Sequence, residues 1–512
     1  MATGPPVSEA TETRRPPPWL AVVVALVLAA AVVLRFWTRS DMWLDEAQTV
    51  NIAKLPWSKI PSALRQDGSP PLYYFLLHFW MRIFGTGNLA VRSLSGVFGV
   101  LSLPLMWLAG RRLAGRTVAW IALALLASSP FAVRYSTENR MYMMMVVITL
   151  GGYLAVDAAL RRPVWWRFVV VAVLAGLLAL SHYWAFYIVA SVVLLLVGLW
   201  WRGRERPPLW CAAAVIVGTV VSLAPWASAL VFQLRHTGTP WSGRANFSAM
   251  VNAVSDYAGG SGSPGRALGL LFFALAGLGL FGVARDRWHI DLDLRTRSPG
   301  RLLTWLSFGT LGFGVLVGYL LDSAYQPRYT AVAFSFFILL VSVGVLAFND
   351  QRVRYGVVGL AVALGLANSA SNVTTDRTQA GQVARAIAAQ GAPGDLVVYC
   401  PDQLGPGVSR LLPAGFAGLT YPRATAPDLV DWVDYAAVNG ASQPGPFAQS
   451  ALARAGPHAV WLVFSSDYAT FGGKCQTLES DLAAARPHSR TVVLQNTTKF
   501  YEHENLDVFL AS

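Results

Sequence analysis

Repeated apolar stretches of about 20 residues are the feature that most constrains how this chain can fold. A stretch of that length forms an α-helix that crosses the hydrocarbon core of a bilayer, where every backbone polar group must be paired internally. Only 13% of the 512 residues are charged, against about 25% in soluble domains. The sequence therefore predicts a polytopic α-helical membrane protein.

We predict about eleven spanning helices in a transmembrane domain over residues 19–371. Residues 1–18 are polar and proline-rich, and we expect them to be disordered on the cytoplasmic side. The first apolar run ends without a small-residue cleavage site, so we expect it to be retained as a helix. The expected spans are 19–37, 91–110, 117–133, 141–160, 168–182, 184–201, 209–233, 266–284, 302–321, 330–348 and 355–371.

Arginine-rich connections predict the orientation of these spans. Short loops rich in Lys and Arg stay in the cytoplasm. All the basic loops fall on one side if the N-terminus is cytoplasmic and the apolar segment 70–84 lies in the outer interface rather than spanning. The net charge of +13 comes from such loops, so we expect a plasma-membrane protein that binds no nucleic acid. The basic loops are 111–116, 161–167, 202–206, 285–301 and 352–354.

The segment 372–512 differs from the rest of the chain. Compact apolar runs such as 395–400 and 459–464 alternate with helical stretches, which is typical of a small α/β domain. We expect it outside the cytoplasm. Cys400 and Cys475 both fall there, and either a disulfide or two unpaired thiols would fit an oxidising compartment.

Adjacent carboxylates follow the first span in the outer loop 38–90. Asp45 and Glu46 are flanked by Trp43 and Leu44. Partial desolvation at a membrane surface favours the neutral form of a carboxyl group and makes it a better base, as removal of a proton from a sugar hydroxyl requires. Ordinary acidity at a helix end is the alternative.

Further charged side chains are expected on the same outer side. Charges near a bilayer are costly, and several on one face are functional candidates. Arginines hold phosphate bidentately, whereas carboxylates serve as bases or sugar ligands. The cluster contains Asp45, Glu46, Asp67, Arg92, Glu138, Arg140 and Arg328.

The segment from Leu44 to Tyr142 resembles the protein O-mannosyltransferase-like group of GT-C glycosyltransferases, which includes the lipid A aminoarabinose transferases. The resemblance rests on the acidic pair, an Asp…Pro-Pro-Leu-Tyr-Tyr motif, Arg92 with Ser95, and a Glu-x-Arg-x-Tyr loop over 138–142. The later Arg328–Tyr329 resembles a weaker motif. Many relatives have a His before the two prolines; here Gly68-Ser69 follows Asp67, so any role of that imidazole is in doubt.

The resemblance implies a GT-C fold and a sugar donor on a polyprenyl monophosphate. It implies that Asp45 is the general base, with Glu46 as a supporting or alternative carboxylate, in a single displacement that inverts the anomeric centre. The donor phosphate would be held by Arg140 and Arg328, with Arg92 and Tyr329 as further candidates. Candidates for binding sugar or acceptor are Trp43, Asp67, Glu138, Tyr142, His182 and Tyr325.

We expect no cofactor, because a monophosphate lacks the diphosphate bridge that a metal usually clamps. A divalent cation such as Mg²⁺ or Mn²⁺ on Asp45, Glu46 and Glu138 is the alternative. Mannose and arabinofuranose are both plausible sugars, and the acceptor is a glycan, lipid or protein. Other hypotheses are a lipid-linked sugar transporter or flippase, which should carry mid-span charges or inverted repeats, and a GT-C-like polymer ligase that uses a lipid diphosphate donor.

Overall fold

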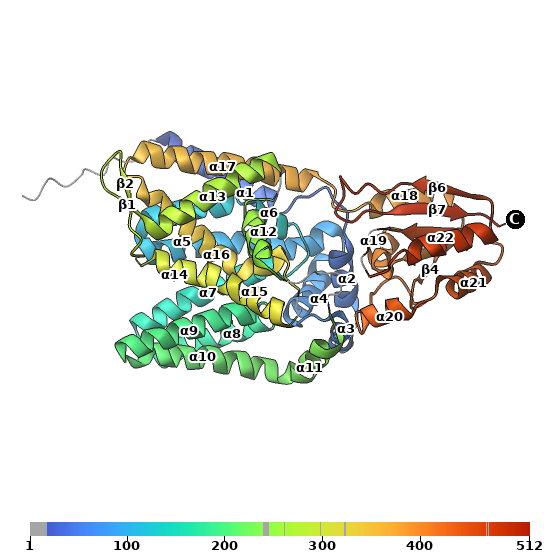
Figure 1. Cartoon of the computed structure of the whole chain (residues 1–512), viewed down its shortest axis with the longest axis horizontal. Coiled ribbons are helices and arrows are strands. Elements are labelled where there is room, and N and C mark those ends of the chain that lie inside the picture. Colours follow the sequence, from blue (N-terminus) through green and yellow to red (C-terminus); the bar gives the residue numbers. More distant parts are fainter. Residues whose placement is uncertain are drawn as a thin grey trace, which may run out of the picture.

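The computed structural model describes residues 18–238, 245–260, 262–296, 298–321, 324–466, 468 and 470–511. The expected disordered N-terminus therefore lies almost wholly outside the described residues. A helical part occupies one end of the molecule and a sheet domain the other, with three short helices at the junction (Figure 1). A polytopic α-helical protein with a C-terminal α/β domain is thus confirmed.

The helices of the first part follow the predicted apolar stretches. The first predicted span corresponds to α1. The next two correspond mainly to α5, in which Ala114 and Gly115 leave helical backbone geometry. The helices are α1 Pro18–Leu34, α5 Asn88–Ala127, α6 Pro130–Ser136, α7 Tyr142–Arg161, α8 Trp165–Ala179, α9 Ala185–Gly203, α10 Arg206–Leu223, η1 Ala224–Trp226, α11 Ala227–His236, α12 Phe247–Tyr257, α13 Ser263–Phe281, α14 Gly300–Thr304, η2 Trp305–Gly309, α15 Thr310–Leu321, η3 Pro327–Thr330, α16 Ala331–Gly344, η4 Val345–Ala347 and α17 Gln351–Thr374.

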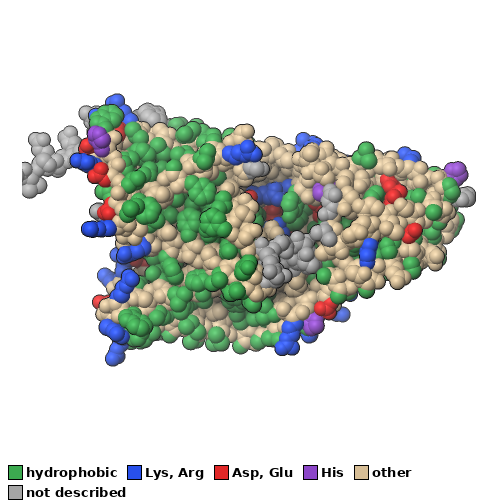
Figure 2. Space-filling model, viewed as in Figure 1, with side chains coloured by type: hydrophobic (Ala, Val, Ile, Leu, Met, Phe, Trp, Pro, Cys, Tyr) green, Lys and Arg blue, Asp and Glu red, His purple; other side chains and the backbone are tan. Residues whose placement is uncertain are grey.

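Each of the eleven predicted spans has a helical counterpart. Among the described residues, eight helices are long and apolar enough to cross a membrane, counting the broken α5 as one, and the helices in 22–34 and 165–179 are apolar but shorter. The number that crosses stays a prediction. Helix α16 lies at the centre, buried on nearly all sides, whereas the outer helices expose apolar side chains over much of their surface (Figure 2).

Three short helices lie between the helical part and the sheet domain: α2 Leu44–Lys54, α3 Ile60–Asp67 and α4 Leu72–Phe84. Helix α4 corresponds to the apolar segment that we placed in the outer interface. It is amphipathic, since Tyr73, Tyr74 and Leu77 are buried while Phe79 and Ile83 are exposed. That distribution fits a helix lying along a membrane surface.

The opposite end of the helical part is basic. A hairpin of β1 Gly282–Ala284 and β2 Ile290–Leu292 lies there, far from the sheet domain (Figure 1). Blue Lys and Arg side chains gather at this end in Figure 2. The molecule therefore has a basic end and a sheet-domain end, as the loop charges predict.

The C-terminal domain contains a five-stranded mixed sheet in the order β4-β3-β5-β7-β6. Strand β3 is parallel to β4 and β5, whereas β7 is antiparallel to β5 and β6. A disulfide joins Cys400 to Cys475. The elements are α18 Ala380–Gln390, β3 Leu396–Cys400, η5 Asp402–Leu404, α19 Gly405–Ser409, β4 Ala417–Thr420, α20 Tyr435–Ala441, α21 Pro444–Ala455, β5 Val460–Phe464, α22 Lys474–Ala485, β6 Ser489–Val493 and β7 Asn505–Phe509.

The sheet domain packs directly on the start of α2. Trp43 and Leu44 belong to the same apolar core as Cys400 and Tyr421, at the carboxyl end of the parallel strands. Figure 2 shows a hollow beside this junction, with basic, acidic and histidine side chains inside it. The fold thus places the predicted outer loop between the helices and the sheet domain.

Candidate active site

Asp45 lies in the first turn of α2 and faces Arg328. Its Oδ2 is 3.6 Å from Nη2 of Arg328. Arg328 belongs to η3, which leads into the central helix α16. The Asp45 side chain is 20% exposed and that of Arg328 14%. A partly buried carboxylate beside an arginine, still open to solvent, can take a proton from a bound hydroxyl.

Arg140 approaches the same helix from the loop before α7. Its Nη1 donates to Oγ1 of Thr49 at 2.8 Å and to the Tyr74 hydroxyl at 3.2 Å. The Tyr74 hydroxyl in turn donates to Asp67, which also accepts from Gln48 at 2.6 Å. Asp67 therefore belongs to a network that orients Arg140, and its two oxygens are already engaged.

His182 lies close enough to Arg140 and Arg328 for the charges of both to act on its ring. Burial, and then the charges of Arg140 and Arg328, lower the pKa of His182 to about 3, so the ring is neutral at physiological pH. Its Nδ1 accepts from the backbone N–H of Trp184, which leaves the proton on Nε2. The ring packs 4.7 Å from that of Tyr329 and 6.2 Å from that of Tyr142.

Several polar atoms around this group are buried without a hydrogen-bond partner among the described residues. They are Nε of Arg140, Nε of Arg328 and the hydroxyl of Tyr142. Buried polar groups are normally paired, so unpaired donors converging from separate elements indicate a site built for a ligand. Because the donors are two guanidinium groups and a hydroxyl, the matching ligand is an anion such as a phosphate.

Glu46 is placed differently from its neighbour. Its two oxygens accept from Nε and Nη2 of Arg92, each at 2.7 Å, and Oε1 also accepts from the backbone N–H of Asn139. Although burial acts to raise it, the charge and hydrogen bonds of Arg92 hold the pKa of Glu46 below its usual value. The remaining bonds of Arg92 go to the carbonyls of Ser40 and Asp41. This geometry favours a structural pair and leaves neither residue directed at a substrate.

We predict that Glu46→Gln lowers the free energy of unfolding by about 3–5 kcal/mol, because it leaves a buried Arg92 uncompensated. Thermal unfolding of detergent-purified protein measures the loss. Asp157→Asn, which breaks the exposed pair with Arg161, is the control and should cost at most about 1 kcal/mol. Equal, small losses in both variants would contradict the structural role.

Glu138 lies in a neighbouring cluster. Its Oε2 is 3.3 Å from Arg134 and 3.8 Å from Arg377, yet both oxygens lack a hydrogen-bond donor among the described residues. Burial raises the pKa of Glu138 in spite of these arginines. In the same cluster, Asp256 of α12 accepts a hydrogen bond from the Tyr135 hydroxyl. Glu138 is therefore the predicted sugar ligand with the most unused acceptor capacity.

Two predicted aromatic ligands are covered. Trp43 is 5% exposed, and the guanidinium of Arg328 lies 5.3 Å above its ring. This cation–π contact supports the arginine and leaves no free ring face for a sugar. Tyr325 is also buried, edge-on to Trp184 at 4.8 Å. The structure places both rings as walls of the site.

Each of the three carboxylates near the site is paired with an arginine rather than with another carboxylate. Asp45 faces Arg328, Glu46 faces Arg92, and Glu138 faces Arg134. In the described part of the chain, no three His, Cys, Asp or Glu side chains gather closely enough to hold an ion. Whether the reaction needs a divalent cation stays a prediction.

Comparisons with known proteins concern the fold and one segment of the chain. Residues 68–228 match the family model described as dolichyl-phosphate-mannose-protein mannosyltransferase, and this range contains Tyr74, Arg140 and His182. ArnT from Cupriavidus metallidurans, bound to undecaprenyl phosphate, has the same fold with a TM-score of 0.58 and 13% identity, covering 96% of this chain and 98% of ArnT. The chain therefore has the fold of the GT-C membrane glycosyltransferases, and its residues 68–228 match the mannosyltransferase family model.

Two other solved glycosyltransferases share the fold. Arabinofuranosyltransferase AftD from Mycobacteria has a TM-score of 0.50 and 13% identity, with 96% of this chain and 40% of AftD covered. The oligosaccharyltransferase AglB from Archaeoglobus fulgidus, in complex with an inhibitory peptide and a dolichol-phosphate, has a TM-score of 0.50 and 11% identity, with 91% and 72% covered. No curated protein matches the chain by sequence.

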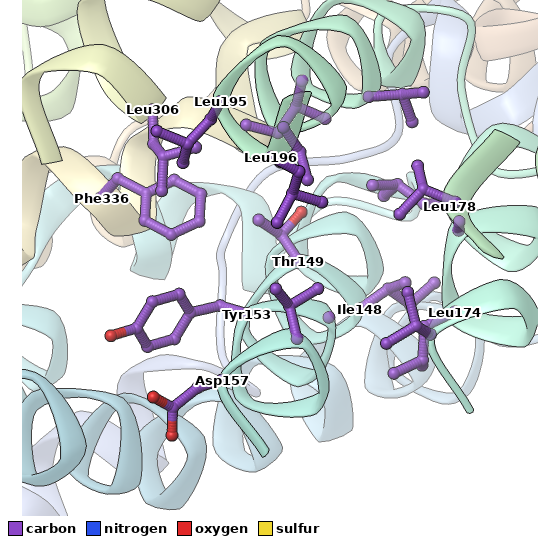
Figure 3. Close-up of a pocket in the computed structure, with 18 of the residues that line it drawn as sticks. Ile148, Thr149, Tyr153, Asp157, Leu174, Leu178, Leu195, Leu196, Leu306 and Phe336 are labelled. Carbon is purple, nitrogen blue, oxygen red and sulfur yellow. The ribbon is translucent and has the colours of Figure 1, made fainter. Parts of the chain in front are cut away.

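The helical part of this GT-C fold contains an apolar groove of about 200 Å³. Figure 3 shows Ile148, Thr149, Leu178 and Phe336 along it, with Asp157 at one end. Ile148 is six residues, about 9 Å of helix, beyond Tyr142 on α7. The residues that line the groove thus start within about two helical turns of Tyr142 and continue along α7, α8 and α9.

Four residues in or beside the candidate active site were not predicted from the sequence. Arg134 and Arg377 surround Glu138, and Tyr501 and Glu502 reach the site from the sheet domain. Arg134 stands four residues before Glu138 on the sequence, a spacing that was available as a signal. The others are far from the motifs, and no local pattern marks them.

Proposed function

We propose that this protein is a membrane glycosyltransferase that transfers a sugar from a polyprenyl monophosphate to an acceptor hydroxyl on the outer side of the plasma membrane. The observation that carries the proposal is the convergence of Asp45, Arg328 and Arg140, with unpaired guanidinium nitrogens, on the outer side of helices that also form an apolar groove. The arginines match a phosphate, the groove matches an isoprenoid chain, and the carboxylate matches a hydroxyl proton. ArnT and AglB were solved with polyprenyl phosphates, which supports this donor class.

The proposed reaction is a single displacement. Asp45 takes the proton of the acceptor hydroxyl, whose oxygen forms a bond to the anomeric carbon while the bond from that carbon to the phosphate oxygen breaks. The polyprenyl phosphate leaves with the electron pair, and its charge is stabilised by Arg140 and Arg328. Attack opposite the leaving group inverts the anomeric centre.

The orientation is part of the proposal. The arginine-rich connections, such as 111–116 and 161–167, lie at the end away from the sheet domain, where Figure 2 shows basic side chains. Positive loops stay in the cytoplasm, so the N-terminus would be cytoplasmic, and Asp45 and the sheet domain would face outward.

The test is incubation of the full-length protein with radiolabelled polyprenyl-phosphate mannose and, separately, polyprenyl-phosphate arabinofuranose, across protein, lipid and glycan acceptors. Transfer of label with release of polyprenyl phosphate supports the proposal. Movement of the intact donor between leaflets, without release of polyprenyl phosphate, would instead show a flippase. Turnover of only a diphosphate-linked donor would show a polymer ligase.

We predict that removal of divalent metal leaves the transfer rate unchanged within about twofold, because arginines rather than an ion stabilise the leaving phosphate. Transfer is measured after treatment with EDTA and after re-addition of Mg²⁺ or Mn²⁺. Loss of activity with EDTA that Mn²⁺ restores would contradict this part of the mechanism.

A further inference from the structure

The segment Tyr501–Glu502 of the sheet domain lies just before β7. It pairs with Thr378, which precedes α18, and contacts the start of α2. Oε1 of Glu502 accepts from the backbone N–H of Leu44 at 3.0 Å, and Oε2 accepts from Oγ1 of Thr378 at 2.6 Å. Backbone bonds from Glu502 N–H to the Arg377 carbonyl and from Gln379 N–H to the Glu502 carbonyl fix the segment. Glu502 is thus buried and held on both sides.

Glu502 supplies the missing cap of the helix that carries Asp45. The residue before α2, Trp43, has no side-chain oxygen, and α2 has no capping hydrogen bond of its own at this end. Leu44 is the first residue of the helix and adjoins Asp45. A carboxylate that accepts from a first-turn N–H also interacts favourably with the helix dipole. The sheet domain therefore supplies a hydrogen bond that the first turn of α2 does not receive from its own N-cap residue.

Tyr501 contacts the partner of Asp45. Nη1 of Arg328 donates to its hydroxyl at 3.4 Å. The Tyr501 ring packs edge-on against Trp43 with centroids 5.3 Å apart, and Trp43 lies under the same guanidinium. Tyr501 is 61% exposed, so these contacts do not serve to complete a core. The two consecutive residues thus hold both members of the Asp45–Arg328 pair.

We propose that the sheet domain is a working part of the active site, in which Glu502 is a positioning residue for Asp45 and Tyr501 for Arg328. This inference rests on the proposed function. A displacement of a catalytic group by about 1 Å can cost about 100-fold in rate. The sheet domain would then do more than cover the site, because the distance between base and phosphate ligand depends on it.

The test is a kinetic comparison of full-length variants with polyprenyl-phosphate mannose and, separately, polyprenyl-phosphate arabinofuranose. The rate is measured as the release of polyprenyl phosphate. Glu502→Ala should lower kcat about 100-fold with a donor KM within about threefold of wild type. Glu502→Gln keeps an oxygen for Leu44 N–H and should recover activity to within about tenfold. In an Asp45→Asn background, Glu502→Ala should cause little further loss, since the two act as a unit.

Asp395→Ala is the matched control. Asp395 is also a buried carboxylate of the sheet domain, and it accepts from the N–H groups of Ala392 and Ala459 and from Trp461. It lies at the other end of β3. If Glu502 has only a structural role, Glu502→Ala and Asp395→Ala should lose stability alike, and kcat of the folded fraction should stay unchanged in both. That result would overturn the inference.

Tyr501→Ala provides a readout that does not depend on the stability of Glu502 variants. Because Tyr501 is largely exposed, the variant should fold, and it should raise the donor KM about tenfold through Arg328. An unchanged donor KM would overturn the Tyr501 part. If Asp45→Asn retains full activity, the proposed function fails; if Asp45→Asn is inactive but Glu502→Ala is not, only this inference fails.

Discussion

Asp45→Asn should lower kcat by about 1,000-fold, within the range of about 10²–10⁴ that a general base contributes. The asparagine has nearly the same shape and still meets Arg328, but it cannot accept the proton of the attacking hydroxyl. Because the side chain is partly exposed and its ion pair with Arg328 is 3.6 Å long, stability should change little. Steady-state kinetics with saturating donor and acceptor measures the effect.

Asp431→Asn is the matched control for this prediction. Asp431 pairs with Arg423 at 3.6 Å and is 33% exposed, so it forms a comparable ion pair in the sheet domain. The control should retain wild-type kcat within about twofold. A similar kcat for Asp45→Asn and wild type would remove Asp45 as the base and direct attention to Glu138, a buried carboxylate near the site whose oxygens accept no hydrogen bond among the described residues.

Arg328→Gln should lower kcat/KM for the donor by about 100- to 1,000-fold, the usual loss when one group that stabilises developing charge is removed. Its guanidinium faces Asp45 and is stacked on Trp43 and Tyr329. Arg328→Lys should recover only part of the loss, because an ammonium lacks the planar fork that binds phosphate bidentately and stacks on rings. Donor-dependent release of polyprenyl phosphate at limiting donor gives kcat/KM.

Arg423→Gln removes the arginine of the control pair and should leave kcat/KM within about twofold of wild type. A second comparison separates the two roles of Arg328. If it binds the donor phosphate, its loss should also weaken binding of undecaprenyl phosphate, whereas Asp45→Asn should not. Equal binding by wild type and Arg328→Gln would show that Arg328 only orients Asp45.

Most of the helical layout could be predicted from the sequence because it depends on local patterns. Apolar length indicates the helices, arginine placement indicates their sidedness, and the short amphipathic α4 was separable from a span by its length. The predicted span 209–233 instead breaks at η1, where Pro225 interrupts the helix and α11 begins. The proline was visible, but its effect depends on the neighbouring elements.

The pairings within the site could not be predicted in the same way. Asp45 and Glu46 are neighbours with equal chemistry, yet one faces an open site and the other a buried Arg92. Successive helix residues point about 100° apart, so which carboxylate meets which arginine depends on where α5 and η3 place Arg92 and Arg328 around α2. Glu502 meets Leu44 only because the sheet domain folds back onto α2.

The most direct test of the central claim is an experimental structure of the protein with bound undecaprenyl phosphate. We predict that the phosphate lies within hydrogen-bond distance of Arg140 and Arg328 and beside Asp45, with its isoprenoid chain entering the groove past Ile148. A phosphate bound instead in the basic pocket at the opposite end, lined by Arg111, Arg112 and Arg161, would contradict the account.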